Sequence, residues 1–125
     1  MNASSLMQLH LSVKLPEDYK SFLDNIGYLC FSNISQEIYG YKQGFDIEKL
    51  PCVIAATKNN KEDYRLDPRE IVLSHAGYED NIIILDTQTS HVFELNLDGY
   101  KEKLADSFSE WLSVMLARNE DNNKE

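Results

Sequence analysis

Four consecutive aliphatic residues, Ile82 to Leu85, constrain the fold more than any other stretch of this sequence. They lie between two polar segments, GYED at 77–80 and TQTS at 87–90. Successive side chains of a strand point to opposite faces of its sheet, so a strand without polar positions must be covered on both faces. The segment 81–86 therefore predicts a central strand with other parts of the protein on both sides.

Two segments beside this strand predict its partners. Residues 70–75 (EIVLSH) are rich in aliphatic side chains, and residues 91–95 (HVFEL) place an acidic side chain between apolar ones. The connections are short enough for hairpins or near neighbours, so the sheet is predicted to be mainly antiparallel. Two further short strands are expected earlier in the chain, at 28–31 and 37–41.

The stretch LPEDYKSFLDNIG predicts a helix with clear start and stop signals. Pro16 suits the first helical position, where its missing N–H would have no partner anyway. Glu17 and Asp18 then lie in the first turn, where carboxylates favour the positive end of the helix dipole. Gly27 can adopt the left-handed conformation that ends a helix. The apolar stripe of this helix follows spacings of three and four: Tyr19, Phe22, Leu23 and Ile26.

Other segments predict a helix near each end of the chain. Leu6, Leu9 and Val13 recur at spacings of three and four, which indicates a short first helix packed by one stripe. Residues 107–110 (SFSE) match a capping box, in which two side chains satisfy exposed backbone N–H groups at a helix start. The polar segment 119–125 (NEDNNKE) predicts a disordered acidic tail.

The segment after Pro51 allows two interpretations. Val53, Ile54 and the following alanines could form a buried strand, or Pro51 could begin another helix, and we favour the helix. The chain shows no repeat and no linker, so residues 1–118 are expected to form one domain. The predicted architecture is α+β, with helices at both ends and one inserted helix packed on a central, twisted, mainly antiparallel sheet.

Charge limits the partners of this chain of 125 residues. Its 21 acidic residues outnumber 12 basic ones, which gives a net charge of -9, and the pI is about 4.7. Contact with phosphate or with anionic lipid requires a basic surface, so we expect neither nucleic-acid nor membrane binding. An acidic surface suits a basic protein partner, although charge considered alone is explained as well by solubility.

The two cysteines and the start of the chain indicate a cytoplasmic protein. Cys30 and Cys52 each lie in an apolar stretch, so we interpret both as reduced, buried thiols. The first 15 residues show neither a basic region nor an unbroken apolar core of the kind found in signal peptides. No stretch approaches the roughly 18 apolar residues of a membrane span.

Residues that could carry chemistry do not form a recognisable motif. A nucleophilic triad could be assembled from Cys30, His75 or His91, and Asp86, but their spacing does not support it. The histidines are far apart, and the sequence contains no HExxH or CxxC for a metal. No glycine-rich loop indicates a nucleotide. We therefore predict no catalytic residue, no metal and no cofactor.

Tyrosines near acidic side chains indicate a surface for protein binding. Tyrosine offers a large contact area with a polar tip and is enriched at protein interfaces. An acidic, tyrosine-bearing rim would fit a basic protein partner. The residues predicted to make this contact are Tyr41, Asp46, Glu48, Glu62, Asp63, Tyr78, Glu79 and Asp80.

The order of several motifs resembles the SUKH superfamily, whose founding eukaryotic member regulates yeast cell-wall synthesis and whose bacterial members are largely immunity proteins. The motifs are LPEDYKSFLDNIGYLCF, EIYGY, EIVLSHAGYEDNIIILDTQTSHVFEL and LADSFSEWL, over roughly residues 6–116. In that family a proline-led helix often follows the IYG strand, which favours a helix after Pro51. The resemblance implies an architectural role for the following residues: Leu15, Pro16, Tyr19, Phe22, Gly27, Asp86, Phe108 and Trp111.

The resemblance implies a protein that acts by binding and carries no catalytic group. We expect an immunity protein, monomeric or weakly dimeric, that binds and occludes a cognate toxin, plausibly a basic nuclease or deaminase. One alternative is a regulatory adaptor of the same fold that acts without a toxin. A second is a small hydrolase that uses Cys30, which an unreactive thiol in the native protein would exclude.

Overall fold

The computed structural model describes residues 2–76 and 80–123, with the side chains of 122 and 123 left aside. Within this part the chain forms four helices and two antiparallel sheets, which confirms the α+β class. The elements in chain order are α1 (Ala3–Leu11), α2 (Glu17–Asn25), β1 (Leu29–Phe31), β2 (Gln36–Ile38), α3 (Val53–Asn60), β3 (Glu70–His75), β4 (Ile82–Asp86), β5 (Val92–Leu95), β6 (Lys101–Ala105) and α4 (Phe108–Asn123).

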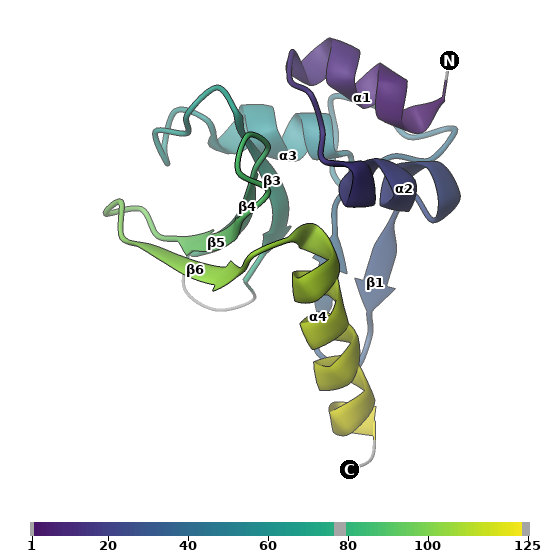
Figure 1. Ribbon diagram of the computed structural model, residues 1–125, viewed down its shortest axis with the longest axis vertical. Coiled ribbons are helices and arrows are strands. Elements are labelled where there is room, and N and C mark those ends of the chain that lie inside the picture. Colours follow the sequence, from purple (N-terminus) through teal and green to yellow (C-terminus); the bar gives the residue numbers. More distant parts are fainter. Residues whose placement is uncertain (1, 77–79, 124–125) are drawn as a thin grey trace.

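The larger sheet has the strand order β3-β4-β5-β6, and all neighbours are antiparallel. Every residue of β4 is buried, which confirms the prediction of a central strand. Ile83 shares a groove with Trp111 of α4, so α4 covers one face of the sheet. Tyr64, from the segment after α3, lines a cavity with Leu95 on the other face. Figure 1 shows α4 extending from one end of the sheet and α1 and α3 gathered at the other end.

Four aromatic side chains join α2 to the start of α4. The ring of Phe108 lies 5.0 Å from that of Tyr19, 5.2 Å from that of Phe22 and 6.1 Å from that of Trp111, measured between centroids. Edge-to-face pairs of this kind stabilise a core beyond the area they bury. The buried hydroxyl of Tyr19 donates to the backbone oxygen of Tyr39 at 2.8 Å. This cluster therefore fixes both helices to the segment that follows β2.

The β1–β2 hairpin is attached to the larger sheet through its second strand. The backbone N–H of Tyr39 donates to Leu73 at 2.7 Å. Directly after it, Gly40 passes so close to Gly27 that a Cβ on Gly40 would lie 1.8 Å from the Gly27 oxygen. The N–H of Tyr41 donates to that same oxygen at 2.9 Å. Two glycines thus bring the end of α2 against the chain that leaves the hairpin.

The structure corrects two predictions about the elements and adds one strand that was not predicted. The first helix ends at Leu11, Leu9 is 65% exposed, and the buried apolar residue of this helix is Met7, so the predicted stripe is wrong. Strand β6 has no predicted counterpart, because its sequence KEKLA is charged and mostly exposed. The predicted tail is wrong for residues 119–123, which continue α4.

Two other predictions agree with the structure, one of them in part. α3 is a helix, which confirms the interpretation favoured for the segment after Pro51. At the start of α4, the N–H of Glu110 donates to the Ser107 hydroxyl at 3.1 Å, as one half of the capping box requires. A second cap comes from α2, because Asp18 accepts from the N–H of Ser109 at 2.9 Å and from its hydroxyl at 3.0 Å.

Candidate protein-binding surface

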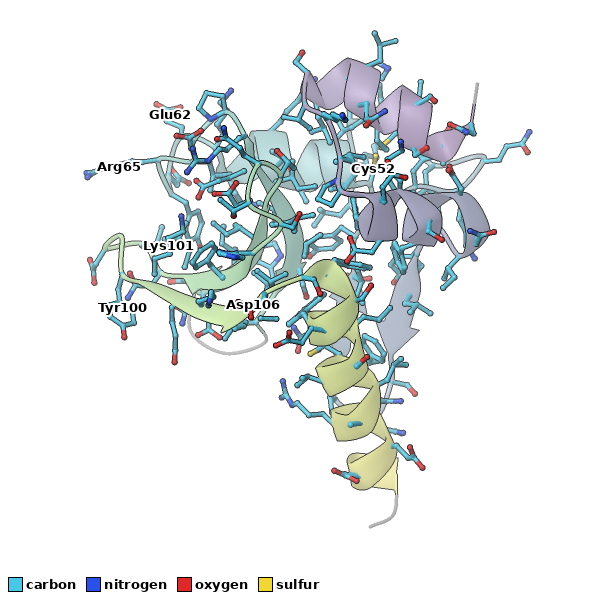
Figure 2. The ribbon with its side chains drawn as sticks, in the orientation of Figure 1. Cys52, Glu62, Arg65, Tyr100, Lys101 and Asp106 are labelled. Carbon is cyan, nitrogen blue, oxygen red and sulfur yellow. The ribbon has the colours of Figure 1, made fainter. Side chains whose placement is uncertain are left out.

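The residues predicted to contact a partner occupy different parts of the molecule. Asp46 and Glu48 lie in the loop before α3, whereas Glu62 and Asp63 follow its C-terminal end. The eight residues of α3 separate the two pairs by about 12 Å along the helix. Figure 2 shows Glu62 at the outer side of the segment after α3, well away from Cys52 at the start of this helix. One compact rim containing both pairs is therefore not formed.

Tyr64 connects the second pair to the β3–β4 connection. Its hydroxyl donates to the backbone oxygen of Asp80. Burial, and then the carboxylates of Asp80 and Asp63, raise the pKa of Tyr64. Asp63 and the exposed Asp80 therefore lie on neighbouring parts of one surface. Two further predicted contact residues, Tyr78 and Glu79, lie outside the described residues.

The first pair lies beside an aromatic cluster that the sequence did not predict as a unit. Phe45 packs edge to face against Tyr28 and Tyr41, with ring centroids 5.9 and 6.1 Å apart. The Tyr28 hydroxyl donates to the half-buried carboxylate of Glu37 on β2. Burial, and then Glu37, raise the pKa of Tyr28, so this hydroxyl stays protonated in the physiological range. Asp46 is exposed at the edge of the cluster.

The sign of the charge around these residues differs from the prediction of an acidic rim. Residues 41–69, which contain both pairs, have six basic and five acidic side chains, a net charge of +1. Residues 92–121, from β5 to α4, have three basic and seven acidic side chains, a net charge of -4. Residues 70–91, which contain Glu79 and Asp80, also have a net charge of -4, from four acidic and no basic side chains. The excess negative charge thus lies in the part of the chain from β3 to α4, which includes one of the three predicted acidic pairs.

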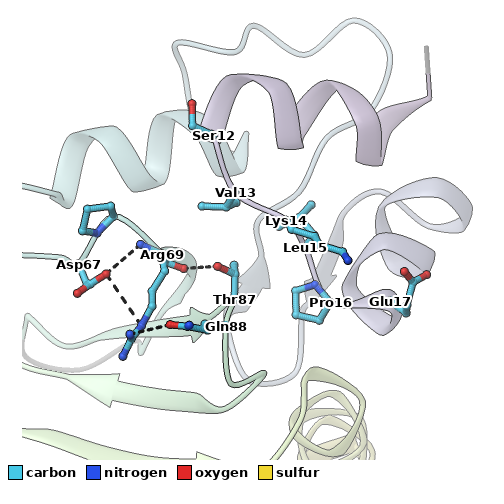
Figure 3. A pocket seen from close by; sticks show the side chains of 11 residues that line it. Ser12, Val13, Lys14, Leu15, Pro16, Glu17, Asp67, Arg69, Thr87 and Gln88 are labelled. Carbon is cyan, nitrogen blue, oxygen red and sulfur yellow. Dashed lines mark hydrogen bonds and ion pairs between the residues drawn. The ribbon is translucent and has the colours of Figure 1, made fainter.

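A cleft lies between the α1–α2 linker and two turns of the main sheet. It has a volume of about 750 Å³ and is lined by residues 12–17, 67–69 and 87–88. Figure 3 shows Leu15 and Pro16 on one side and Arg69 on the other. The Arg69 guanidinium donates from Nε to Asp86 at 3.0 Å and from Nη1 to Gln88 at 2.9 Å. One wall of the cleft is therefore held in place by charged hydrogen bonds.

Asp86 organises this wall from a buried position, with 2% of its surface exposed. Its Oδ1 accepts from the N–H groups of Gln88 at 2.9 Å and Thr89 at 3.1 Å, and its Oδ2 accepts from Arg69. Burial alone would raise the pKa of this carboxyl, but the two N–H groups and the guanidinium outweigh it, so the pKa is lowered. Asp86 is thus a charged support for the β4–β5 turn.

The candidate nucleophilic triad is not assembled around Asp86. The Asp86 carboxylate already accepts hydrogen bonds from Arg69 and from the β4–β5 turn. The β3–β4 register places Asp86 opposite Glu70, whereas His75 lies opposite Ile82 at the other end of the strand pair. The Nδ1 of His75 is 2.6 Å from the Tyr39 hydroxyl. Burial lowers the pKa of His75.

Cys52 is buried as predicted, but Cys30 is exposed, so its prediction as a buried thiol is wrong. The β1–β2 hairpin has a second face that no layer covers at Cys30, whose cross-strand partner is Glu37. Alkylation in the native state therefore cannot exclude a hydrolase, because an exposed thiol reacts in any case.

The described residues contain no group of three or more histidine, cysteine or acidic side chains placed to hold a metal ion. Within the same residues, no helix combines the length and the apolar character needed to cross a membrane. The aromatic cluster at Phe45, the cleft at Arg69 and the groove beside α4 each offer a surface or cavity that a ligand could contact.

A comparison with known families matches residues 4–117 to the family model SUKH_5, described as SMI1-KNR4 cell-wall. The match covers both sheets and all four helices, except Ala3 at the start of α1 and the end of α4. The chain belongs to the SUKH superfamily, which confirms the resemblance in the sequence. Members of this family are generally non-enzymatic. A search of curated proteins found no significant match.

Proposed function

We propose that this chain is an immunity protein that binds a cognate toxin domain and blocks its active site or substrate channel. The observation that carries the proposal is the family match over residues 4–117, because the bacterial members of this superfamily are largely immunity proteins. Such a protein acts by occlusion and needs no bond-making group of its own.

The charge of the chain supports a basic partner. Toxins that attack nucleic acid need a basic surface to bind phosphate, and this chain has a net charge of -9. Opposite charges steer the two proteins together and accelerate association, and salt screens this attraction. We therefore expect the association rate constant to fall about tenfold or more between low and high salt, with a much smaller change in the dissociation rate.

Growth of cells that express the product of the neighbouring gene, with and without this chain, tests the proposal. We expect the product to stop growth alone and to be neutralised when this chain is co-expressed. The purified pair should form a complex whose association slows with salt. A toxic product that this chain neither binds nor neutralises would refute the proposal, as would an equal association rate at low and high salt for its electrostatic part.

The alternative is an adaptor of the same fold that acts without a toxin. The cell-wall description of the matching family model favours it. A neighbouring gene whose product has no effect on growth, together with recovery of a non-toxic partner by this chain, would support the adaptor.

A further inference from the structure

The turn that joins β5 to β6 carries two apolar side chains that the fold leaves uncovered. We call residues 96–100 the outer turn. Leu97 is 49% exposed, and Tyr100 is 68% exposed, more than any other large apolar side chain of the described residues. Figure 2 shows Tyr100 at the outer end of the β5–β6 hairpin. Within the described part of the chain the Tyr100 side chain forms no hydrogen bond and no ring contact, so the whole ring is available to a partner.

Asn96 holds the outer turn in one conformation. Its side-chain oxygen accepts from the N–H groups of Asp98 at 3.0 Å and Tyr100 at 2.9 Å. Its backbone N–H donates to the Tyr100 oxygen at 3.1 Å, and its backbone oxygen accepts from Gly99 at 3.1 Å. Gly99 has a φ of 91°, which glycine adopts without a steric cost. The backbone of the turn is thus preorganised, and a partner that binds it has little left to order.

The cations near the outer turn lie on its inner side. Arg65 and Lys101 line a cavity of about 210 Å³ there, together with Leu97. Lys101 is engaged in this position, because its Nζ contacts Glu70 at 2.6 Å and lies 4.3 Å from the centroid of the Phe93 ring. Tyr100 does not line the cavity. Since successive side chains of a strand point to opposite faces, the Tyr100 ring points to the outer side.

A carboxylate lies two positions before this ring in the same turn. Asp98 is exposed, and it forms no ion pair with any residue that the structure describes. The N–H groups of Asp98 and Tyr100 are held by the same oxygen of Asn96, which fixes the two residues relative to each other. A cation of a partner can therefore pair with Asp98 without breaking a contact inside the domain.

An aromatic ring near a carboxylate matches the two groups by which a nucleic acid is held. Proteins that bind single strands stack the bases on aromatic side chains and pair the phosphates with lysine and arginine. A phenol ring can enter a slot that is shaped for a base. A carboxylate can pair with a cation that is placed for a phosphate.

We propose that the outer turn is the segment of this chain that enters the substrate site of the toxin, in the manner of a nucleotide. The ring of Tyr100 occupies the apolar slot, and the carboxylate of Asp98 pairs with a lysine or arginine beside it. This inference rests on the proposed function for the identity of the partner. It adds the segment and the two groups through which the substrate site is blocked.

The chemistry can be tested without a toxin by a probe that imitates such a site. Amino-β-cyclodextrin has an apolar cavity whose rim carries ammonium groups, and it is titrated into the full chain labelled with ¹⁵N. We expect saturable amide shifts at residues 97–101, with a dissociation constant on the order of millimolar. Neutral β-cyclodextrin should bind the same turn about threefold more weakly. Equal binding of the two forms, or shifts confined to other residues, would overturn the proposal.

Two pairs of variants separate the outer turn from general effects of charge and apolar area. Asp98→Asn should abolish the preference for the amino form, while Asp121→Asn, which removes the same charge from another exposed site, should keep it. Tyr100→Thr should weaken binding of both forms at least about threefold. Its control is Leu9→Ser, because Leu9 is 65% exposed on α1. A preference that survives Asp98→Asn, or binding that survives Tyr100→Thr, would contradict the proposal.

The complex with the toxin, the product of the neighbouring gene, gives the second test. Tyr100→Thr and Asp98→Lys should each raise the dissociation constant at least about tenfold, and Leu9→Ser should leave it unchanged. Asn96→Ala keeps both groups but removes the acceptor that fixes them, so it should raise the constant about threefold. The side chains of Tyr100 and Asp98 support no other part of the described fold, so urea unfolding should show nearly unchanged stability for their variants.

The outcomes also distinguish this inference from the proposed function. If dilution without cyclodextrin moves the amides of the outer turn, its partner is a second copy of the chain, and the proposal is wrong. The expected cyclodextrin binding by a chain that neutralises no toxin would refute the proposed function alone. Neutralisation of the toxin that is unaffected by Tyr100→Thr and Asp98→Lys would refute the outer turn as the inhibitory segment.

Discussion

Replacing Gly40 by alanine tests the close approach of two backbone segments at Gly40 and Gly27. A Cβ at this position would lie 1.8 Å from the backbone oxygen of Gly27 and 3.3 Å from the Leu23 side chain. Real Cβ contacts do not occur below 3.0 Å, so the two backbone segments must separate by more than an ångström. Neither neighbour can rotate away, because the first is backbone and the second belongs to the buried face of α2.

The cost follows from what the separation breaks. The hydrogen bond from Tyr41 to the Gly27 oxygen, 2.9 Å long, would be lost, at about 1 kcal/mol. Overpacking of a filled site adds about 3 kcal/mol, at the upper end of its range because backbone must move. We expect Gly40→Ala to lower the free energy of unfolding by about 4 kcal/mol, a large part of the 5–15 kcal/mol typical of a domain, and Tm by about 16 °C.

Gly44→Ala is the matched control. Gly44 has a positive φ of 97° but nothing within 4 Å of an added Cβ, so only backbone strain of about 1–2 kcal/mol is expected. Urea unfolding followed by far-UV circular dichroism and by the fluorescence of the single, buried Trp111 gives both free energies. The reasoning about close approach is wrong if Gly40→Ala unfolds at the same urea concentration as Gly44→Ala.

Three further predictions concern buried or exposed polar groups. Asp86→Asn should destabilise the protein by about 1–3 kcal/mol near neutral pH. The pKa of Asp86 is lowered in the folded state. The stabilisation by this carboxylate is therefore present above its unfolded-state pKa of about 3.9, and it is lost as the pH falls through the folded-state pKa. Thr57→Val leaves the buried N–H of Val72 without its acceptor, 3.0 Å away, and should cost about 1–3 kcal/mol. Iodoacetamide should label Cys30 in the native protein and Cys52 only after unfolding, because burial excludes Cys52 from solvent and raises its pKa.

Each of these has a result that would contradict it. Urea unfolding at several pH values should show that the difference in free energy of unfolding between wild type and Asp86→Asn shrinks below about pH 4. A difference that grows below this pH would contradict the lowered pKa of Asp86. Thr57→Ser keeps the acceptor, so equal stability of the serine and valine variants would show that this hydrogen bond contributes nothing. Mass spectrometry of the labelled protein would contradict the third prediction by finding Cys52 modified before Cys30.

Local patterns predicted the elements whose signals lie within one segment. The apolar run of β4, the start of α2 and the Ser107 cap depend on neighbouring residues, so periodicity and capping chemistry were sufficient. The prediction for the first helix failed because Ser12 takes a left-handed conformation that ends this helix early. Ser4 is then buried with the Asp24 carboxylate as its partner, 2.8 Å from its hydroxyl. Residue spacing within the helix cannot predict a hydrogen-bond partner that lies 20 residues away in the sequence.

The candidate surface was harder to predict because it depends on contacts between strands. β6 became a strand through pairing with β5 and through the ion pair of Lys101 with Glu70, neither of which its own charged sequence reveals. The distribution of charge along the chain can be read from the sequence, but only the fold shows that Glu94, Leu104 and Trp111 line one groove.

The cap that Asp18 supplies to Ser109 joins residues 91 positions apart in sequence. The ribosome synthesises α2 long before α4, so the Asp18 carboxylate cannot cap α4 until almost the whole domain has emerged. The aromatic cluster at Phe108 also needs both α2 and α4. The cap of α4 and this part of the core therefore form together in a single late step of folding. We therefore expect a nascent chain halted before residue 107 to remain open to proteases, and one extended past α4 to become resistant.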